Sequence, residues 1–358
     1  MAVNLREFSK LVGLSPTTVS RALSGYPEVK SETRKRVRDE ALRLGYHPNR
    51  NAAGLSTGRA DAIGIVVWDE GIDPGAAEIF TGLASRLEHD GIDIVLSKAA
   101  SRAAELLVYR RLVASKKVDA IVLLGPSVHD ERVALLEELN IPFVLHGRTE
   151  TSKSYAYVDI DNFGAVQQAT SHLLDLGHRN IAFINGYKGM TFVEDRERGF
   201  RAAFSEHGLE PHPGQFANGP FTDEFGYTTT RSLLGSTNPP TAIIASFMTA
   251  ALGAMRAIRA AGLTVGRDIS LIAHDDVFPY LSADGMIPPL STTRSSVRAG
   301  GWRVGDFVVQ LLAGKKPEVL QEVWPVELVL RRSTARPAPA PGIGGPAPQQ
   351  GHRQASNA

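Results

Sequence analysis

Val12-Gly13-Leu14-Ser15-Pro16-Thr17-Thr18-Val19-Ser20-Arg21-Ala22-Leu23-Ser24-Gly25 is the stretch of sequence that decides how the chain begins. Ser15 is a good helix N-cap, because its hydroxyl can accept a hydrogen bond from a backbone N–H of the first turn. Pro16 follows at the first helical position, where its missing N–H costs nothing. Gly25 supplies the left-handed residue that ends many helices. The stretch therefore predicts a tight turn at Gly13 and a short helix after it.

A second short helix is predicted just upstream. Asn4 and Glu7 have the spacing of a capping box, and Leu5, Phe8 and Val12 fall on one helical face. Two short helices joined by a glycine turn form the helix-turn-helix pattern, whose second helix enters the major groove of DNA. A buried helical hairpin of any globular protein has the same spacing.

The side chains of the second helix help to separate these two interpretations. Its inward positions hold Leu14, Val19 and Leu23. Its outward positions hold short hydroxyl groups and one guanidinium: Thr17, Thr18, Ser20 and Arg21. Because such groups suit phosphate oxygens and base edges, the pattern favours DNA binding.

Charge is distributed unevenly along the chain. The 358 residues have a formal net charge of +1. Residues 1–60 hold 11 Lys and Arg against 5 Asp and Glu, while the remainder holds 28 against 33. A basic head on a mildly acidic body indicates a polyanionic partner for the head alone. The basic run Arg34-Lys35-Arg36 lies in a third predicted helix, from Ser31 to about Leu44, as either a solvated face or a phosphate clamp.

Composition excludes several classes of protein. A chain with 43% hydrophobic residues at this length can bury more than one core. The absence of cysteine excludes a disulfide framework and a thiolate metal site. The N-terminus has no apolar signal-peptide core, and the longest apolar run, around 242–255, is too short and too polar to span a bilayer. The sequence predicts a soluble, cytoplasmic protein without a membrane partner.

From residue 62 onward, apolar runs of strand length alternate with amphipathic helical stretches. Strands are predicted at 63–67, 92–96, 118–124, 143–145, 181–184, 242–245 and 269–273. Helices are predicted near 78–90, 101–116, 130–139, 163–176, 197–207, 224–234, 249–261 and 298–313. Strands buried on both faces and separated by helices indicate parallel sheets. The two blocks, roughly 62–158 and 162–290, predict two α/β lobes with a cleft, where ligands bind at the carboxyl ends of strands.

Two further segments differ from both head and body. The segment from Asn49 to Thr57 is a marginal helix, because it is short and Gly54 costs about 1 kcal/mol of helix propensity relative to alanine. It should form only when something else holds it. Residues 335–358 are rich in Pro, Gly and Gln and are predicted to be a disordered tail. The tail has no leucine heptad that would assemble a coiled coil.

An ordered set of motifs extends across most of the chain. In the head these are Leu14 to Leu23, then Leu44-Gly45-Tyr46-His47-Pro48-Asn49 and Ala52-Ala53-Gly54-Leu55. In the body they are Asp161-Asn162-Phe163-Gly164-Ala165, His172 to Arg179, Arg196-Glu197-Arg198-Gly199-Phe200 and Asp275-Asp276. Together they resemble the lactose-repressor (LacI/GalR) family of bacterial transcription regulators, over residues 4 to about 334.

The resemblance implies an α/β protein with an N-terminal all-α helix-turn-helix head. A hinge helix would join this head to a two-lobed, periplasmic-binding-protein-like body of parallel sheets. The implied domains are a head at 1–47, a hinge helix and linker at 48–60, an effector-binding and dimerisation body at 61–334 and the tail at 335–358. Lobe 1 would take about 61–160 and 292–322, and lobe 2 about 161–291 and 323–334.

The resemblance also implies a homodimer whose two heads read a pseudo-palindromic operator in double-stranded DNA. By position, Pro16, Thr17 and Arg21 face base edges, and Arg21 is the candidate for a bidentate contact with guanine. The three hydroxyl residues would hold phosphates: Ser15, Thr18 and Ser20.

Three candidates for DNA contact lie in the hinge: Asn49, Ala52 and Leu55. Leu55 matches a hinge leucine that wedges into the minor groove at the operator centre. It could equally be a plain helix-face leucine that packs on its dimer mate. Because the helix is marginal, its folding can be coupled to DNA binding.

The resemblance places a small-molecule effector between the lobes. Arg196 and Asp275 are the strongest candidates, one donating hydrogen bonds to sugar hydroxyls and one accepting them, although either could form an interlobe salt bridge instead. Asp161, at the lobe crossing, is a third. Trp68 is placed either to stack on a pyranose face or to pack at the lobe rim.

Aromatic residues set this chain apart from many sugar-responsive members. Phe192 and Phe221 are further candidates for the pocket. Where many members carry Asn-Asp, this chain reads Ser246-Phe247-Met248-Thr249, so Phe247 replaces a polar reader of hydroxyls. Ala273-His274 stands where a Gly-aromatic pair is usual. These changes favour a bulkier glycoside such as a disaccharide over a free hexose. His146-Gly147-Arg148 resembles a subgroup associated with α-glucosides.

Other functional classes have less support. There is no phosphate-binding loop, no nucleophile elbow and no strand-linked dinucleotide fingerprint. His274-Asp275-Asp276 could be imagined as metal ligands, but adjacent residues at a strand end project in different directions. The sequence predicts no enzyme, no cofactor and no metal. It predicts a repressor of carbohydrate uptake or catabolism genes with a sugar-like effector. The alternatives are an activating or non-sugar-responsive member of the family, or a sugar-binding transport protein.

Overall fold

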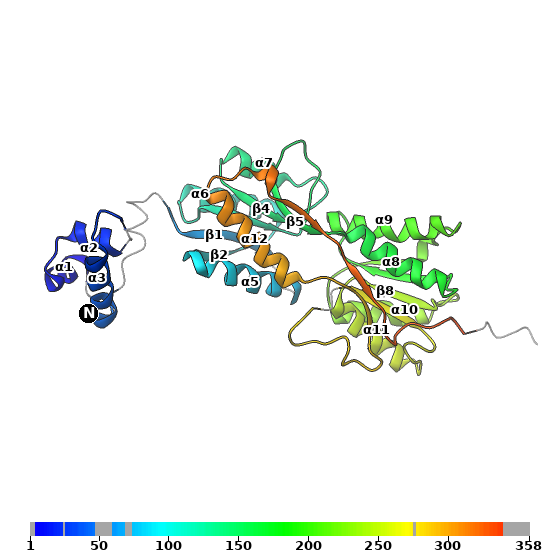
Figure 1. Ribbon diagram of the computed structural model, residues 1–358. Coiled ribbons are helices and arrows are strands. Elements are labelled where there is room, and N and C mark those ends of the chain that lie inside the picture. The colour runs from blue at the N-terminus through cyan, green and yellow to red at the C-terminus, as the bar shows by residue number, and fades with distance from the viewer. Residues whose placement is uncertain (1–3, 24–25, 47–58, 69–73, 275–276, 339–358) are drawn as a thin grey trace, which may run out of the picture.

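The computed structural model describes residues 4–23, 26–46, 59–68, 74–274 and 277–338. They form a small helical head followed by a body of two α/β lobes (Figure 1). The head contains α1 (Leu5–Val12), α2 (Pro16–Leu23) and α3 (Ser31–Leu44). Its core includes Phe8 and Tyr46, whose rings stack with centroids 4.2 Å apart. The helices predicted on both sides of the glycine turn, and the third helix after them, are confirmed.

The first lobe is built on a six-stranded, wholly parallel sheet. In spatial order its strands are β11 (Gln321–Trp324), β5 (Ala156–Ile160), β4 (Phe143–His146), β3 (Ala120–Leu124), β1 (Ala62–Trp68) and β2 (Asp93–Ala99). One face packs on α5 (Pro74–Leu87) and α12 (Val297–Leu312). The other face packs on α6 (Arg102–Ala114) and α7 (Glu131–Glu138). A short 3-10 helix, η1 (Glu88–Asp90), follows α5, and η3 (Pro317–Val319) precedes β11.

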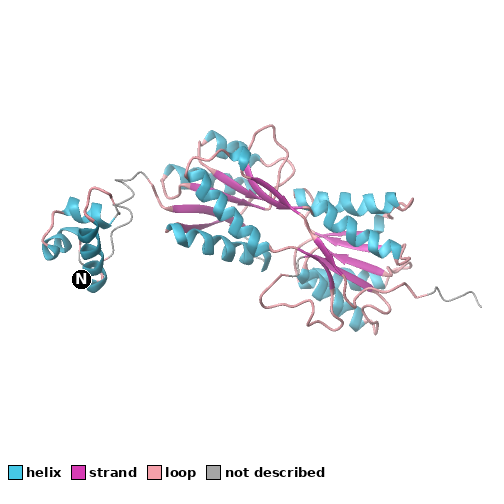
Figure 2. Ribbon diagram, in the orientation of Figure 1, coloured by secondary structure: helices cyan, strands magenta, loops and turns pink. Residues whose placement is uncertain are grey.

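The second lobe repeats this plan, with one antiparallel strand at its edge. In spatial order its strands are β12 (Glu327–Val329), β10 (Ser291–Arg294), β9 (Ser270–His274), β8 (Ala242–Ala245), β6 (Ile181–Asn185) and β7 (Phe216–Asn218). One face packs on α8 (Asn162–Asp175) and α9 (Thr191–Glu206). The other packs on α10 (Asp223–Leu234) and α11 (Met248–Ala260). The 3-10 helix η2 (Pro213–Gln215) precedes β7. In Figure 2 both sheets lie between layers of helices.

Glycines allow the paired helices of each lobe to approach closely. A Cβ atom on Gly301 of α12 would lie 2.2 Å from the carbonyl oxygen of Ile79 in α5. A Cβ on Gly199 of α9 would lie 2.2 Å from the carbonyl oxygen of Phe163 in α8. Because real Cβ atoms do not come so close, any larger residue there would push the helices apart.

The chain crosses between the lobes three times within the described residues. It leaves the first sheet after β5, returns after β10 and leaves again after β11. Since β10 pairs with β9, the return falls after Arg294, three residues later than the domain limits implied by the resemblance. The last crossing follows Trp324, because β11 pairs with β5.

Several elements differ from those predicted. The strands β5, β7, β10, β11 and β12 were missed, because they are short or, as in β10, carry buried hydroxyl side chains. Helix α9 begins at Thr191, six residues before the predicted start. At the start of the predicted tail, the carbonyl of Ala335 lies 2.8 Å from His178 Nε2, and its N–H donates to Ser270 Oγ at 3.0 Å. Residues 339–358 lie outside the described residues.

Candidate functional site

The turn between α1 and α2 is fixed by side-chain caps. Asn4 and Glu7 form the expected capping box, with reciprocal hydrogen bonds of 3.0 and 3.1 Å. Gly13 ends α1 with a φ of 71°, a left-handed conformation that favours glycine. Ser15 Oγ accepts from the N–H of Thr18 at 3.1 Å, so Ser15 caps α2 as expected.

The exposed surface of the head presents the outward side of α2. Pro16, Thr17 and Arg21 are exposed, while Thr18 and Ser20 are half-buried. The hydroxyl of Thr18 lies 2.8 Å from that of Ser15, so these two candidates for phosphate contact also bond to each other. Val19 is fully buried, and the half-buried Leu14 and Leu23 pack on the same core, which confirms their inward positions.

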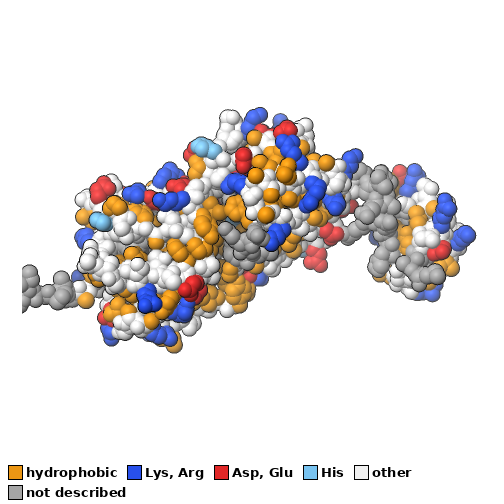
Figure 3. All heavy atoms as spheres, turned by 180° about the vertical axis from the view of Figure 1, so that it is seen from behind, with side chains coloured by type: hydrophobic (Ala, Val, Ile, Leu, Met, Phe, Trp, Pro, Cys, Tyr) orange, Lys and Arg blue, Asp and Glu red, His pale blue; other side chains and the backbone are white. Residues whose placement is uncertain are grey.

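The basic run on α3 divides into two kinds of residue. Arg34 Nη1 donates to the carbonyl of Tyr26 at 3.2 Å, which ties α3 to the loop after α2. Lys35 and Arg36 are exposed and available to a polyanion. In Figure 3 Lys and Arg side chains are prominent on the visible face of the head, whereas the body shows a mixture of both charges.

The connection between head and body is described only at its end. The hinge candidates Asn49, Ala52 and Leu55 lie outside the described residues. Where the chain enters the body, the N–H groups of Ala60 and Asp61 donate to the carboxylate of Asp119 at 2.8 and 2.7 Å. The linker is thereby fastened to the first lobe, at the start of β3.

A cavity of about 550 Å³ lies between the two lobes, and we call it the interlobe cavity. The first lobe contributes the last residues of several parallel strands: Trp68, Leu124, His146, Ile160 and Trp324. The second lobe contributes a group of aromatic side chains, among other residues: Tyr187, Phe192, Phe221, Phe247, Phe278 and Tyr280. The cavity therefore lies at the carboxyl ends of strands, where parallel α/β sheets bind ligands.

The structure brings most of the candidate effector residues together. The cavity is lined by Trp68, Phe192, Arg196, Phe221 and Phe247. Asp161 is not among the lining residues, because its carboxylate caps α8 by accepting from the N–H of Gly164 at 2.8 Å. Asp275 lies outside the described residues.

Arg196 is a buried residue with well-defined partners in the second lobe. Its Nε donates to Asn162 Oδ1 at 2.8 Å, and its Nη1 donates to the carbonyl of Ser246 at 3.0 Å. Its guanidinium lies 4.9 Å from the ring centroid of Phe192 and 5.1 Å from that of Phe247. The arginine thus links α9 to α8 and to the loop after β8. It lies behind four aromatic side chains that we call the aromatic wall: Tyr187, Phe192, Phe221 and Phe247.

The phenylalanines of that wall touch one another. The rings of Phe221 and Phe247 have centroids 4.0 Å apart, and Phe192 lies 6.1 and 6.2 Å from these two. Tyr187 adds an edge contact with Phe221 at 5.6 Å. Such a surface offers several ring faces against which an apolar or a sugar ring can stack.

Sequence reasoning missed several residues of the cavity, among them the polar Arg132, His146 and Asn162 and the aromatic Tyr187, Tyr280 and Trp324. His146 ends β4, so a polar residue directly after an apolar run was the available signal. Burial lowers the pKa of His146, against the opposing charge of Asp159. Arg132 lies in the first turn of α7, and nothing in its sequence context indicated that it faces a cavity.

An ionic contact joins the lobes beside the cavity. Arg148 of the first lobe donates to Asp159 Oδ2 at 2.7 Å, and its Nη2 lies 3.6 Å from Asp195 Oδ2 on α9. Asp195 also pairs with Arg198. Each charge at this crossing therefore has an opposite neighbour.

The described ranges contain no cluster of three His, Cys, Asp or Glu residues that could hold a metal ion. His274 is buried, and its Nδ1 lies 2.7 Å from Thr293 Oγ1. The two aspartates after it, Asp275 and Asp276, lie outside the described residues. Among the helices that the structure describes, none is both long and apolar enough to cross a membrane.

Both the head and the body of the chain match families of known proteins. Residues 4–49 match the family model of bacterial regulatory proteins of the lacI family, and residues 170–334 match that of the periplasmic binding protein-like domain. The transcriptional regulator AglR of Rhizobium meliloti (strain 1021) is 44% identical, with 96% of this chain and 100% of AglR covered. The transcriptional regulator RafR of Escherichia coli is 34% identical, over 90% of this chain and 96% of its own.

Solved structures extend the likeness to three dimensions. The lac repressor dimer bound to operator and the anti-inducer ONPF has a TM-score of 0.81 at 26% identity, over 94% of this chain and all of its own. The regulator CelR in complex with cellobiose has a TM-score of 0.69 at 29% identity, over 92% and 99%. The chain belongs to the lacI family of bacterial transcription regulators.

Proposed function

We propose that the protein is a homodimeric regulator whose affinity for a pseudo-palindromic operator is set by a neutral glycoside bound between the lobes. We propose further that it represses genes of carbohydrate uptake or catabolism from the cytoplasm, without a catalytic role of its own. The observation that carries the choice of effector is the interlobe cavity, which combines aromatic walls with charged groups that all have partners.

Recognition of DNA rests on the exposed side of α2. Arg21 and Thr17 are exposed on one side of this short helix, whose opposite side is anchored by the buried Val19. A guanidinium can make a bidentate contact with guanine in the major groove, while hydroxyls bond to phosphates. Two heads are needed, because one recognition helix reads only a half-site.

The charges around the interlobe cavity support a neutral ligand. The guanidinium of Arg132 is paired with Glu105 and Asp130, at 2.9 and 2.7 Å. The carboxylate of Asp159 is paired with Arg148, and Arg196 donates to Asn162 and to the carbonyl of Ser246. Arg132 is thus neutralised, and two N–H groups of Arg196 already donate to neutral acceptors, so a phosphorylated or carboxylated sugar would shed its hydration shell for at most one guanidinium.

The shape and lining of the cavity support a glycoside of two rings. A volume of about 550 Å³ is within the range of sites that enclose small organic ligands. Trp68 and Trp324 lie on the first lobe and Phe192, Phe221 and Phe247 on the second, so each lobe offers faces for stacking. The neighbouring structure of CelR holds cellobiose, which is a neutral disaccharide.

Fluorescence anisotropy of the purified protein on the DNA beside its own gene tests the proposal, at a fixed salt concentration because affinity for DNA depends strongly on salt. The titration is repeated with glucose, maltose, sucrose, trehalose, cellobiose and sugar phosphates. We expect a neutral disaccharide to change operator affinity, and the phosphates to have no effect. A response to sugar phosphates alone would contradict the assignment of a neutral effector, and the absence of any specific DNA binding would contradict the whole proposal.

Two variants separate the two sites. Arg21→Ala should weaken operator binding and leave disaccharide affinity unchanged, because Arg21 lies in the head. Phe247→Ala should weaken disaccharide binding and leave sugar-free operator affinity unchanged. Whether the regulator represses or activates depends on where the operator lies relative to the promoter, which a reporter assay measures.

A further inference from the structure

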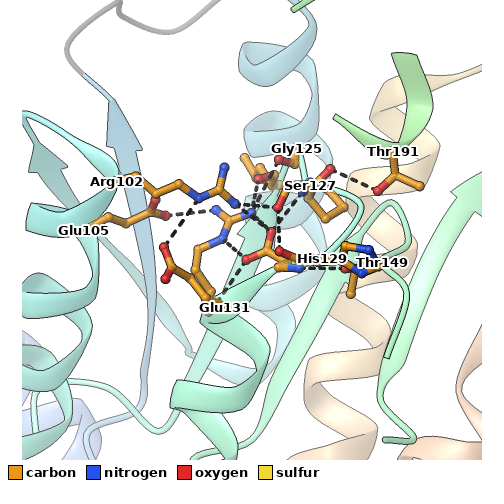
Figure 4. A network of polar contacts seen from close by, with 12 residues as sticks. Arg102, Glu105, Gly125, Ser127, His129, Glu131, Thr149 and Thr191 are labelled. Carbon is orange, nitrogen blue, oxygen red and sulfur yellow. Dashed lines mark hydrogen bonds and ion pairs between the residues drawn. The ribbon is translucent and has the colours of Figure 1, made fainter. Parts of the chain in front are cut away.

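A buried ionic chain runs through the first lobe, from the wall of the interlobe cavity towards the second lobe (Figure 4). It consists of Glu105 on α6, Arg132 on α7 and Asp130, the N-cap of α7. Arg132 Nη1 donates to Glu105 Oε1 at 2.9 Å, and its Nε and Nη2 donate to the two oxygens of Asp130 at 2.9 and 2.7 Å. The side chains of Glu105 and Asp130 are fully buried, and that of Arg132 is 2% exposed.

One end of the buried ionic chain fixes Trp68. The indole Nε1 of Trp68 donates to Glu105 Oε2 at 2.8 Å. An indole has a single N–H, so this hydrogen bond sets the orientation of the ring that lines the cavity. The guanidinium of Arg102 lies over the indole of Trp68, 5.7 Å from its ring centroid, and this cation–π contact further restricts the ring.

The other end of the chain fixes a loop that touches the second lobe. Asp130 Oδ2 accepts from the N–H of Ser127 at 3.0 Å, and Arg102 Nη2 donates to Ser127 Oγ at 2.8 Å. Ser127 forms an isolated antiparallel bridge with Met190 of the second lobe. We call the pairing of residues 126–128 with residues 189–191 the interlobe bridge.

The interlobe bridge is held by two backbone hydrogen bonds. The N–H of Val128 donates to the carbonyl of Gly189 at 3.1 Å, and the N–H of Thr191 donates to that of Pro126 at 3.0 Å. Thr191 is the first residue of α9, and the residue before it provides no side-chain cap. A carbonyl of the first lobe therefore satisfies the first N–H of α9, which would otherwise lack a partner in the helix.

Helix α9 links the interlobe bridge to the interlobe cavity. Its second residue is Phe192 and its sixth is Arg196, and both line the cavity. A change in the interlobe bridge would therefore shift the aromatic wall on the second lobe. The same bridge connects the loop after β3 in the first lobe to α9 in the second. Breaking its hydrogen bonds would therefore allow the two lobes to move apart at this point.

The ionic nature of the chain suggests a role other than stability. Removing charged groups from water is costly, and well-packed apolar residues often stabilise a core equally well. What a fully hydrogen-bonded network offers is a defined geometry, because each member can occupy only the position that satisfies its partners. Arg102 and Arg132 balance Glu105 and Asp130, so the network is also neutral.

We propose that Glu105 is a positioning residue that couples a ligand seated on Trp68 to the interlobe bridge, and through the bridge to DNA affinity. The proposal rests on the proposed function for its ligand, a neutral glycoside. A ligand that stacks on Trp68 reorients the indole and so displaces Glu105. The displacement reaches Ser127 through Arg132 and Asp130. The hydrogen bonds of the interlobe bridge then become stronger or weaker. Glu105 itself does not need to touch the ligand.

Hydrogen–deuterium exchange of the full-length protein without sugar tests the structural half of the proposal. Glu105→Gln keeps the size of the side chain but leaves one carbonyl oxygen to serve three donors: Trp68, Tyr109 and Arg132. We expect the amides of Val128 and Thr191 to exchange at least tenfold faster in this variant. Unchanged exchange at both amides would overturn the proposal.

The matched control is Tyr109→Phe. Tyr109 is buried and its hydroxyl donates to Glu105 Oε1 at 2.8 Å, but it does not lie between Trp68 and the bridge. Exchange of the two bridge amides should stay within twofold of wild type, and equal acceleration in both variants would show a merely structural role for Glu105. If Glu105→Gln does not fold, Trp68→Phe replaces it, because it removes the indole N–H that donates to Glu105 and keeps an aromatic ring.

A second measurement tests the coupling itself. The dissociation constant of cellobiose, or of whichever disaccharide moves the wild-type protein, is measured with and without operator DNA, and the ratio of the two values gives the coupling. We expect Glu105→Gln to reduce this ratio at least tenfold, over and above any change in the affinity measured without DNA. A loss of affinity with the ratio intact would overturn the coupling role. If no sugar affects wild-type DNA binding, the choice of effector fails, and the exchange experiment still decides the proposal on the bridge.

Discussion

Replacing Arg196 with methionine tests whether the cavity wall depends on one buried guanidinium. Arg196 donates at 2.8 Å to Asn162 and at 3.0 Å to the carbonyl of Ser246. Methionine keeps an unbranched, flexible side chain that can pack against Phe192 and Phe247, but both acceptors lose a donor. A buried acceptor without a donor costs about 1–3 kcal/mol, so we expect the free energy of unfolding to fall by about 2–6 kcal/mol.

Urea denaturation followed by circular dichroism at pH 7 measures this loss. The matched control is Arg198→Met on the same helix, where the side chain is 69% exposed and pairs with Asp195. An exposed ion pair contributes about 0–1 kcal/mol, so the control should be close to wild type. A loss in Arg196→Met no larger than in Arg198→Met would refute the reasoning, because other groups would then satisfy the two acceptors.

Three further predictions follow from the geometry. Gly301→Ala should lower the unfolding free energy by about 1–3 kcal/mol through overpacking, since the new Cβ would lie 2.2 Å from the Ile79 carbonyl oxygen; Gly305→Ala, which meets only side-chain carbons at 3.1 Å, should cost less in the same urea titration. Burial lowers the pKa of His274 well below its usual value, so the unfolded chain binds a proton there before the folded protein does. The stability of the folded protein is therefore unaffected by this proton above the unfolded-state pKa of about 6.5, and it falls as the pH drops from there towards the folded-state pKa. We expect the urea midpoint to decrease between pH 7 and pH 5, and to decrease less in His274→Gln. Arg21→Ala should weaken binding to the specific operator by about 1–3 kcal/mol in anisotropy titrations at fixed salt, and an unchanged preference for operator over random DNA would contradict a base contact.

The head could be predicted almost residue by residue, because its signals are local. Ser15, Pro16 and Gly13 determine where α2 begins through caps and backbone angles that depend on neighbours in the sequence. The buried strands of the body were equally accessible, since β1 and β8 read as continuous apolar runs. Short edge strands such as β12 have no such run and depend on pairing with distant strands, which periodicity does not register.

The candidate site was predicted where the resemblance supplied a position, and missed where a residue faces the cavity only through tertiary packing. Phe192, Phe247 and Arg196 could be placed by position, and all three line the cavity. The partners of a buried charge are set by tertiary packing, so Glu105 and Arg132, 27 residues apart in the chain, gave no signal that they would meet. Asp161, whose carboxylate caps α8, shows a related ambiguity, because a helix cap and a ligand contact use the same carboxylate.

Because the chain crosses between the lobes three times, the first lobe cannot be completed until most of the chain has been synthesised. The sheet of the first lobe has five of its six strands by Ile160, but α12 and β11, which cover and extend it, are made only when the chain reaches Trp324. At ~5–20 residues per second, about 160 further residues take on the order of ten to thirty seconds to synthesise. The helical head, by contrast, needs only its own 3 helices and is complete at the outset. A nascent chain therefore exposes its DNA-reading surface well before the cavity that regulates it can close.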